Sequence, residues 1–219
     1  MASERKLDLG AVTQLVIAGW TGRDVAALEA HIRELEAIGV KRPKSTPIFY
    51  RAAASLLTHA DTIQVVGEHS SGEVEFVLFA LDDDIWVGVG SDHTDRKLET
   101  IGVTVSKQIC AKPVGRFAWR FDDVQAHWDR LILRSFATIN DQRRLYQEGA
   151  VAGMRSPSDL IKLYNGQSSL PPGTAMFGGT FAVHGGIAAG GLFEMELDDP
   201  VLGRKLMHRY AIVSLPDEG

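Results

Sequence analysis

The sequence predicts an α+β fold made mostly of short strands with a few helices around them. Twenty-two glycines and eight prolines in 219 residues indicate many turns, which favours a strand-rich fold over a helical bundle. Many short segments are β-branched or apolar and end at a glycine or an aspartate-rich turn, whereas few show helical spacing of apolar residues. We find no internal repeat, low-complexity tract or linker, so we expect one domain over residues 1–219.

Strands are expected where β-branched and apolar residues gather. Residues 12–19 form such a segment and end at a glycine. Residues 62–91 predict several strands, interrupted at Gly67, Gly72 and the turn at Asp82–Asp84. Within that stretch, residues 74–81 are nearly all apolar, which predicts a strand buried on both faces. Three further strands are expected after a turn at residues 170–174, namely 175–183, 192–197 and 209–215.

Helices are expected in three places. From Asp24 to Ile38 apolar residues recur every three or four positions and Gly39 follows, which is typical of an amphipathic helix. Residues 122–150 carry helical periodicity and predict one or two helices. Residues 156–166 begin at a serine and end at a glycine, which predicts a short helix. Residues 47–57 fit a strand or a helix equally well.

Composition and charge argue against several classes of partner. The net charge of −5 gives no electrostatic reason to expect a nucleic acid or an anionic membrane as partner. The first ten residues are polar and do not resemble a signal peptide, and no apolar run is long enough to span a bilayer. The single cysteine, Cys110, cannot form an internal disulfide, which fits a reducing compartment. We therefore expect a cytoplasmic protein.

Two glutamates precede the predicted buried strand. Glu73 and Glu75 are two residues apart, so in a strand their side chains point to the same face. Like charges that converge at the edge of a core are costly unless a cation lies between them. The alternative is a solvated edge of the strand, and the spacing alone favours that alternative because the pattern is weak.

An acidic turn follows the next strand and changes that balance. Residues 88–96 bring Asp92, His93, Asp95 and Arg96 into a turn flanked by glycine. Functional groups concentrate on such loops, and carboxylates are the ligands that Mg²⁺ prefers. Glu73, Glu75 and Asp92 are therefore candidate ligands of one cation, with an ordinary polar turn as the alternative for Asp92.

A series of motifs resembles the fumarylacetoacetate hydrolase family, specifically its short members, over about residues 19–180. The motifs occur in the family's order: TGRD at 21–24, HIRE at 31–34, TPIFYR at 46–51, GEVE at 72–75, SDHTDR at 91–96, SKQICAKPVG at 106–115 and LPPGTAMFGGT at 170–180. Three features depart from the family pattern. Asp92 follows Glu75 more closely than in the family, Arg51 replaces a lysine, and Thr180 lacks the proline that often follows.

The resemblance implies a mixed β-roll or sandwich fold, a homodimer and a set of site residues. Glu73, Glu75 and Asp92 would bind Mg²⁺ or Mn²⁺, and Lys107 would place a positive charge beside an enolate oxygen. His31 would be the base that activates water and Glu34 the carboxylate that orients it, on a helix that orders when substrate binds. Substrate-binding groups would be Gly179, Thr180, Arg23 and Arg51, with ion pairing inside the protein as the alternative for the arginines.

These roles predict a metal-dependent hydrolase or lyase that acts on a small oxo acid through a metal-stabilised enolate. The reaction would be C–C hydrolysis of an acylpyruvate-like compound or decarboxylation of a β-oxo acid. The first alternative is an isomerase, hydratase or dehydratase on the same scaffold. The second is a non-catalytic protein that binds a small molecule.

Overall fold

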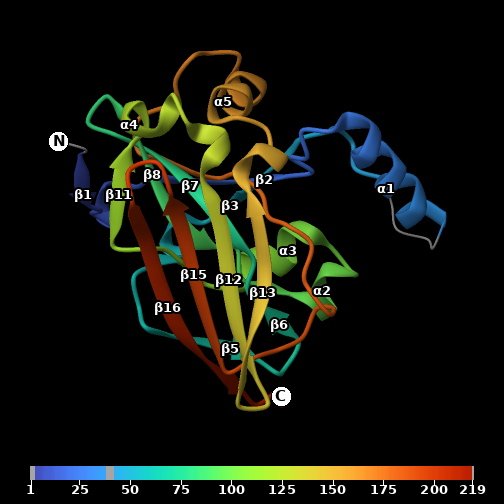
Figure 1. Ribbon diagram of the computed structural model, residues 1–219. Coiled ribbons are helices and arrows are strands. Elements are labelled where there is room, and N and C mark those ends of the chain that lie inside the picture. The colour runs from blue at the N-terminus through green and yellow to red at the C-terminus, as the bar shows by residue number, and fades with distance from the viewer. Residues whose placement is uncertain (1–2, 38–41, 219) are drawn as a thin grey trace.

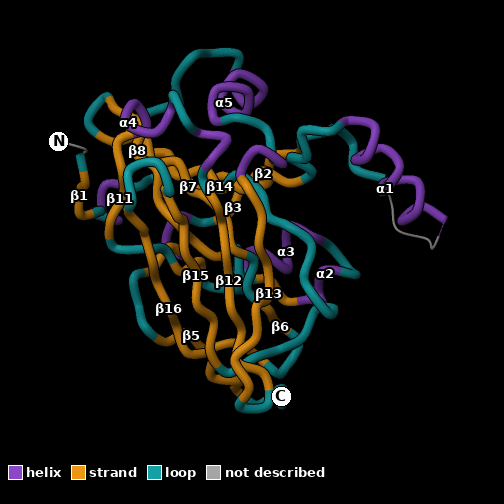
Figure 2. The backbone as a smooth tube through the Cα atoms, in the orientation of Figure 1, coloured by secondary structure: helices purple, strands orange, loops and turns teal. Residues whose placement is uncertain are grey.

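The computed structural model describes residues 3–37 and 42–218. Within them, most strands belong to two mixed sheets, with the helices at the periphery (Figures 1 and 2). The first sheet has seven strands, in the spatial order β1 (Glu4–Lys6), β11 (Phe117–Arg120), β8 (Asp84–Ser91), β7 (Val74–Leu81), β14 (Thr174–Phe177), β2 (Gln14–Gly19) and β3 (Ile48–Ala52). Of these pairs, β14 and β2 are parallel and the others antiparallel.

The second sheet lies in front of the first in Figure 1. Its five strands are, in spatial order, β13 (Gln142–Ala150), β12 (Ile132–Ile139), β15 (Leu192–Asp199), β16 (Arg204–Leu215) and β5 (Thr62–Val66). Two short ribbons complete the strands: β4 (Leu57–Thr58) with β10 (Lys112–Pro113), and β6 (Ser70–Ser71) with β9 (Thr94–Asp95). Together the two sheets confirm the α+β class that the sequence predicts.

The described residues contain five α-helices, all of them short or peripheral. They are α1 (Val25–Ala37), α2 (Arg96–Glu99), α3 (Val103–Gln108), α4 (Phe121–Gln125) and α5 (Pro157–Asn165). Single 3-10 turns occur at Leu9–Ala11, Ala54–Leu56, Trp128–Arg130 and Val151–Gly153. Among the described helices, none combines the length and apolar character needed to cross a membrane.

Both faces of the seven-stranded sheet carry an apolar core. Alternate residues of β7, such as Phe76 and Leu78, pack in the cluster that fills the space between the two sheets. The residues between them, Val77 and Phe79, pack in a second cluster on the opposite face. Every residue of β7 is buried, which confirms the prediction for residues 74–81. Glu75 shares the face of Val77, so it lies on the side of the sheet away from the second sheet.

One predicted region is wrong. Residues 122–150 were expected to be helical, but only α4 at their start is an α-helix, and β12 and β13 form a hairpin after it. Burial alternates along β12 from Leu133 to Ala137, as a strand with one face on a core requires. Asn140 and Asp141 both have positive φ, the conformation of a two-residue hairpin turn.

The other expected elements agree more closely with the structure. The helix expected over 24–38 is α1, although residues 38–41 lie outside the described residues. The helix expected over 156–166 is α5, which Ser156 caps and which ends at Gly166 in the left-handed conformation. The ambiguous residues 47–57 contain β3 and a 3-10 turn. The strand expected over 175–183 ends at Phe177.

Candidate metal centre

The pairing of β7 with β8 brings the three predicted metal ligands together. Glu73 precedes β7 and Asp92 follows β8, and the Asp92 N–H donates to the Glu73 carbonyl at 3.0 Å. Glu75 lies opposite Gly90 in the register. Residues directly opposite or diagonal in an antiparallel pair share a face, so all three side chains project to one side.

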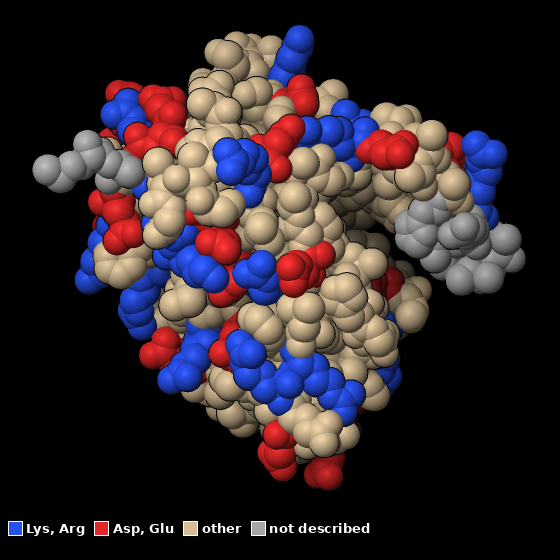
Figure 3. Space-filling view, in the orientation of Figure 1, with Lys and Arg blue, Asp and Glu red and all other residues tan. Residues whose placement is uncertain are grey.

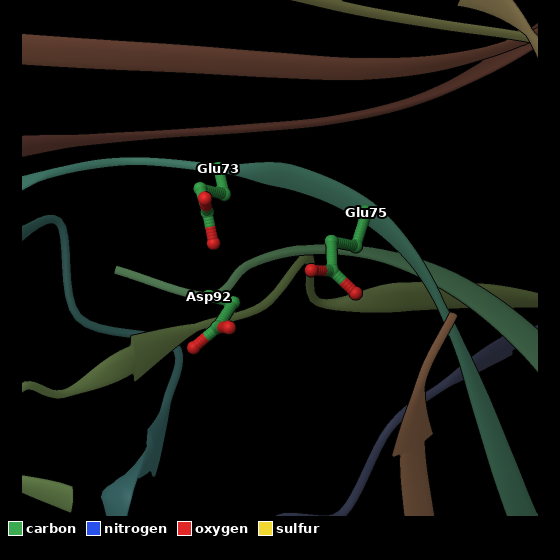
Figure 4. A group of neighbouring side chains, drawn as sticks. All are labelled: Glu73, Glu75 and Asp92. Atoms are coloured by element: carbon green, nitrogen blue, oxygen red, sulfur yellow. The ribbon is translucent and has the colours of Figure 1, made fainter. Parts of the chain in front are cut away.

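The three carboxylates converge. One oxygen from each of Glu73, Glu75 and Asp92 lies within 4.8 Å of the others, and Figure 4 shows the carboxylates facing a common space. Glu75 is 2% exposed and Asp92 is fully buried. Burial, together with the charges of Asp92 and Glu73, raises the pKa of Glu75 well above its ordinary value. The cluster therefore favours a cation that neutralises it.

Two lysines contact Asp92 from different elements. Lys107 on α3 donates a short hydrogen bond to Asp92 Oδ2 and lies 3.6 Å from Glu73 Oε2. Lys112 on β10 lies 3.0 Å from Asp92 Oδ1 and donates to the His93 carbonyl at 2.5 Å. Burial opposes ionisation of Asp92, but the two lysines outweigh it and lower the pKa of Asp92 to about 2. Burial likewise opposes the charge on Lys107, but Asp92 and Glu73 raise the pKa of its ammonium.

Arg96 at the start of α2 anchors the third carboxylate. Its guanidinium lies 3.0 Å from both Glu73 Oε1 and Glu99 Oε2, and it donates to Ser71 Oγ at 2.8 Å. These contacts give Arg96 a role in holding Glu73 in place.

The segment after β14 closes the site on the side of Glu75. The Gly179 N–H donates to Glu75 Oε2 at 2.6 Å. Gly179 has φ +103°, and a Cβ there would lie 1.9 Å from Thr21 Oγ1, so only glycine fits this position. The Thr180 hydroxyl donates to the Val74 carbonyl and accepts from Gln147 Nε2, both at 2.7 Å. These groups, predicted to bind a substrate carboxylate, make contacts within the chain here.

A buried chain of polar groups supports the acidic turn from the second sheet. His93 lies between Ser70 Oγ and the Tyr210 hydroxyl, at 2.9 Å from each. The Tyr210 hydroxyl donates to Ser91 Oγ at 2.8 Å, and Ser91 Oγ accepts the Glu73 N–H at 3.2 Å. Burial and the charges of Lys112 and Arg96 lower the pKa of His93 to about 3, so this imidazole is neutral.

The donor set suits a hard divalent cation. Three carboxylates supply anionic oxygen ligands on one side, as Mg²⁺ and Mn²⁺ prefer, and leave other positions for water or substrate. Within the described structure, Asp92 Oδ1 has its ion pair with Lys112 but no hydrogen bond, so it keeps a lone pair for a cation.

The remaining predicted residues lie away from the three carboxylates or outside the described side chains. Arg23 forms a two-point ion pair with Asp129, at 2.7 Å for each nitrogen. Arg51 is exposed on β3 and contacts the Tyr164 hydroxyl at 3.4 Å. His31 and Glu34 belong to α1, which projects from the body of the molecule in Figure 1. The side chains of His31 and Glu34 lie outside the described part of the structure.

Sequence reasoning missed Lys112, Tyr210 and Tyr50. Lys112 lies within the motif at residues 106–115 and Tyr210 in the strand expected over 209–215, but nothing in the local sequence shows that they contact Asp92 and His93. Tyr50 is next to Arg51 on β3, so the two side chains point to opposite faces. The Tyr50 ring packs near Gly19, and burial raises the pKa of its hydroxyl against the opposing charge of Lys107. Alternation along TPIFYR could have suggested Tyr50 in place of Arg51.

The family model described as "Protein of unknown function (DUF2848)" matches residues 18–210 of the chain. The chain belongs to this DUF2848 family. Comparison with curated proteins finds no match.

Several solved structures share the fold of this DUF2848 protein. The yeast protein ynq8, a fumarylacetoacetate hydrolase family protein, aligns with a TM-score of 0.67 at 15% identity, over 96% of each chain. A protein from Yersinia pestis CO92, provisionally assigned to that family, gives 0.62 at 16% identity over 92% of this chain and 93% of that one. A 2-keto-3-deoxy-D-arabinonate dehydratase complexed with magnesium and 2,5-dioxopentanoate gives 0.67 at 16% identity, over 94% of this chain and 75% of that one.

These similarities confirm the resemblance at the level of the fold. The DUF2848 chain has the mixed β-roll fold of fumarylacetoacetate hydrolase family proteins. Its own acidic cluster lies at the open end of the β7–β8 hairpin, away from the turn.

Proposed function

We propose that the protein is a divalent-metal-dependent enzyme that acts on a small oxo acid as a hydrolase or lyase. The convergence of Glu73, Glu75 and Asp92 beside the buried ammonium of Lys107 carries this proposal. A bound Mg²⁺ or Mn²⁺ would act as a Lewis acid on the substrate's oxygens and stabilise the negative charge that develops there. The magnesium in the dehydratase of the same fold supports a metal of this kind.

Lys107 supplies positive charge and not a base. Its ammonium is held by Asp92 and Glu73, which raise its pKa, so it stays protonated at neutral pH. A fixed ammonium in a buried site stabilises an oxyanion without reorganising during the reaction. We therefore assign Lys107 to the oxygen on which enolate charge develops.

The general base that activates water must come from outside the acidic cluster. The buried imidazole nearest to it, His93, uses both ring nitrogens for Ser70 and Tyr210, and its pKa of about 3 makes it a poor base at neutral pH. Our candidate is His31 with Glu34 on α1. Figure 3 shows the molecule hollowed between the arm that carries α1 and the body, and substrate could enter there.

A dehydratase is the second candidate. A 2-keto-3-deoxy-D-arabinonate dehydratase has the same fold and binds magnesium with 2,5-dioxopentanoate. Dehydration of a 2-oxo acid also begins by stabilising enolate charge, which the acidic cluster and Lys107 can support. Water activation by His31 would be dispensable in that reaction.

Turnover of a substrate panel tests the proposal. Acylpyruvates, oxaloacetate and sugar-derived 2-oxo acids should be assayed with Mg²⁺ and with chelator. We expect turnover of at least one compound with metal only, competitive inhibition by oxalate, and loss of both turnover and inhibition in Lys107→Met. No turnover across the panel, together with oxalate binding that needs neither metal nor Lys107, would contradict the proposal.

A further inference from the structure

Lys112 on β10 is a charged residue that the proposed chemistry does not use. Its side chain is fully buried. Lysine is almost never fully buried unless it is paired, because removing an ammonium from water is costly. Its described partners are Asp92 Oδ1, at 3.0 Å, and the His93 carbonyl, at 2.5 Å. A buried ammonium is therefore fixed directly on a candidate metal ligand.

The two ammonium groups offset much of the negative charge of the cluster. Asp92 faces both of them, Lys107 on Oδ2 and Lys112 on Oδ1, and Lys107 also lies 3.6 Å from Glu73 Oε2. Arg96 adds a positive charge that Glu73 and Glu99 share. The cluster therefore keeps less negative charge than three unpaired carboxylates would have.

The two ammonium groups have two consequences for ligands. A divalent cation at the carboxylates is repelled by both ammonium groups, so the cation alone binds more weakly than three unpaired carboxylates would allow. An anion that binds together with the cation reduces this repulsion, and more so with two negative charges than with one. By linkage, metal and anion must strengthen each other's binding by the same factor.

We propose that Lys112 is a specificity-determining residue, which makes the centre favour chelating ligands with two negative charges over those with one. The proposal rests on the metal site of the proposed function. It assigns the substrate class as an oxo acid that carries, or develops on binding, a second negative charge close to the first.

Oxalate and oxamate form a matched pair of probes. They have the same planar shape and two adjacent oxygen donors, but oxalate has two negative charges and oxamate one. Calorimetry would measure the affinity of each for wild type with saturating Mg²⁺, and for Lys112→Met, which keeps the length of the side chain without its charge. Dividing each ratio of affinities by the ratio for free Mg²⁺ in buffer removes the intrinsic difference in chelation.

We expect the corrected oxalate-to-oxamate ratio to exceed one in wild type by at least about tenfold, equivalent to roughly 1.4 kcal/mol. In Lys112→Met the ratio should fall towards one, while Mg²⁺ alone should bind more tightly. An unchanged ratio in a folded Lys112→Met protein would overturn the proposal. Lys112→Gln serves if the methionine variant does not fold. Should both fail to fold, a wild-type ratio near one still refutes the proposal, a ratio above tenfold that persists in Lys107→Met supports it, and a ratio that falls to one in Lys107→Met refutes it.

Failure of the inference differs from failure of the metal site. If wild type binds Mg²⁺ and both probes but does not discriminate between their charges, only the role of Lys112 is wrong. If wild type binds Mg²⁺ in neither the presence nor the absence of oxalate, the proposed function itself is wrong.

Discussion

The acidic corner (Glu73, Glu75 and Asp92), where β7 begins and β8 ends, differs from α1 in how its side chains are held. At the corner, each carboxylate has partners from other elements: Arg96 for Glu73, the Gly179 N–H for Glu75, and Lys107 for Asp92. Helix α1 projects from the sheets, and Val25 at its start is 60% exposed. Several elements therefore hold the candidate metal ligands in place, whereas the proposed base lies on a helix that projects from the sheets.

The difference suggests that the acidic corner binds the cation and that α1 supplies the base. Charges that bind a cation need fixed positions, because the cost of burying them is recovered only in good geometry. A base that acts after substrate binds can arrive on a separate element. Substitutions at the corner should therefore change stability and metal binding, and substitutions on α1 should change turnover alone.

The largest effect on stability is expected for Asp92→Asn. The substitution removes the carboxylate paired with the buried Lys112 ammonium and leaves Lys107 with Glu73 as its remaining ion-pair partner, which costs about 3–5 kcal/mol. Urea unfolding in chelator would measure it. Asp129→Asn is the matched control, since it removes an exposed ion pair with Arg23 and should cost less than about 1 kcal/mol. Equal losses of unfolding free energy in the two variants would show that the buried contacts of Asp92 stabilise the fold no more than an exposed ion pair does.

The next effect concerns pH. The pKa of Glu75 is higher in the folded state, so the folded state binds its proton more tightly than the unfolded chain does. The tighter proton binding adds to the free energy of unfolding. This added stability is fully present below about pH 4.3, the ordinary pKa of glutamate, and is lost as pH rises through the pKa of Glu75 in the folded state. Chelated wild type should lose stability over that range, and Glu75→Gln should lose less. Asp92 affects stability in a separate pH range. Because its pKa is lowered in the folded state, the stability that its carboxylate contributes is lost only as pH falls from about 4 to 2.

Glu99→Gln is the control for the pH experiment, since Glu99 pairs with Arg96 outside the cluster. Its unfolding free energy should decline with pH as wild type does. If Glu75→Gln declined equally, Glu75 would not be the group responsible.

A smaller effect is expected for Tyr210→Phe. The substitution removes the Tyr210 hydroxyl, which joins His93 to Ser91. Ser91 in turn accepts the Glu73 N–H, so the lost hydroxyl helps to position the Glu73 backbone. We expect a loss of about 1–2 kcal/mol of stability and a severalfold weaker affinity for Mg²⁺. Leu197→Ala, a fully buried apolar residue of the same core, should cost stability and leave the affinity for Mg²⁺ unchanged. Normal Mg²⁺ affinity in Tyr210→Phe would show that the hydroxyl chain supports the fold only.

The smallest effect on stability is expected for His31→Ala. The free energy of unfolding and the affinity for Mg²⁺ should stay at wild-type values, while turnover falls about 10²–10⁴-fold, the usual contribution of a positioned base. Steady-state kinetics beside calorimetry measures both. A parallel loss of Mg²⁺ affinity would make His31 a ligand, and an unchanged rate would favour the dehydratase.

The acidic cluster was predictable because the family resemblance pointed to the same three residues that the local pattern left open. Glu73 and Glu75 share a face through the two-residue period of a strand, and the turn at Asp82–Asp84 returns the chain so that Asp92 lies opposite Glu73. Lys112 was not predictable, because its burial depends on contacts across β10 that only the folded chain creates. The position of α1 relative to the sheets is likewise not encoded in the helix's own pattern.

The hairpin of β12 and β13 was missed for a physical reason. Ser135 and Gln147 face the core, where the Ser135 hydroxyl donates a hydrogen bond to Gln147 Oε1 at 3.1 Å. The same oxygen accepts the Val74 N–H. These polar residues break the apolar alternation by which a half-buried strand is recognised. The same contact supports the start of β7, so the feature that hid the hairpin helps to position the site.

Metal binding tests the central claim most directly. Chelator-treated wild type should gain thermal stability with added Mg²⁺ or Mn²⁺ by mass action, and calorimetry should show one cation per chain. Glu75→Gln should lose this gain, whereas Glu99→Gln, a glutamate outside the cluster, should keep it. No stabilisation of wild type by any divalent ion, or the same stabilisation in Glu75→Gln, would show that Glu73, Glu75 and Asp92 are not a metal site.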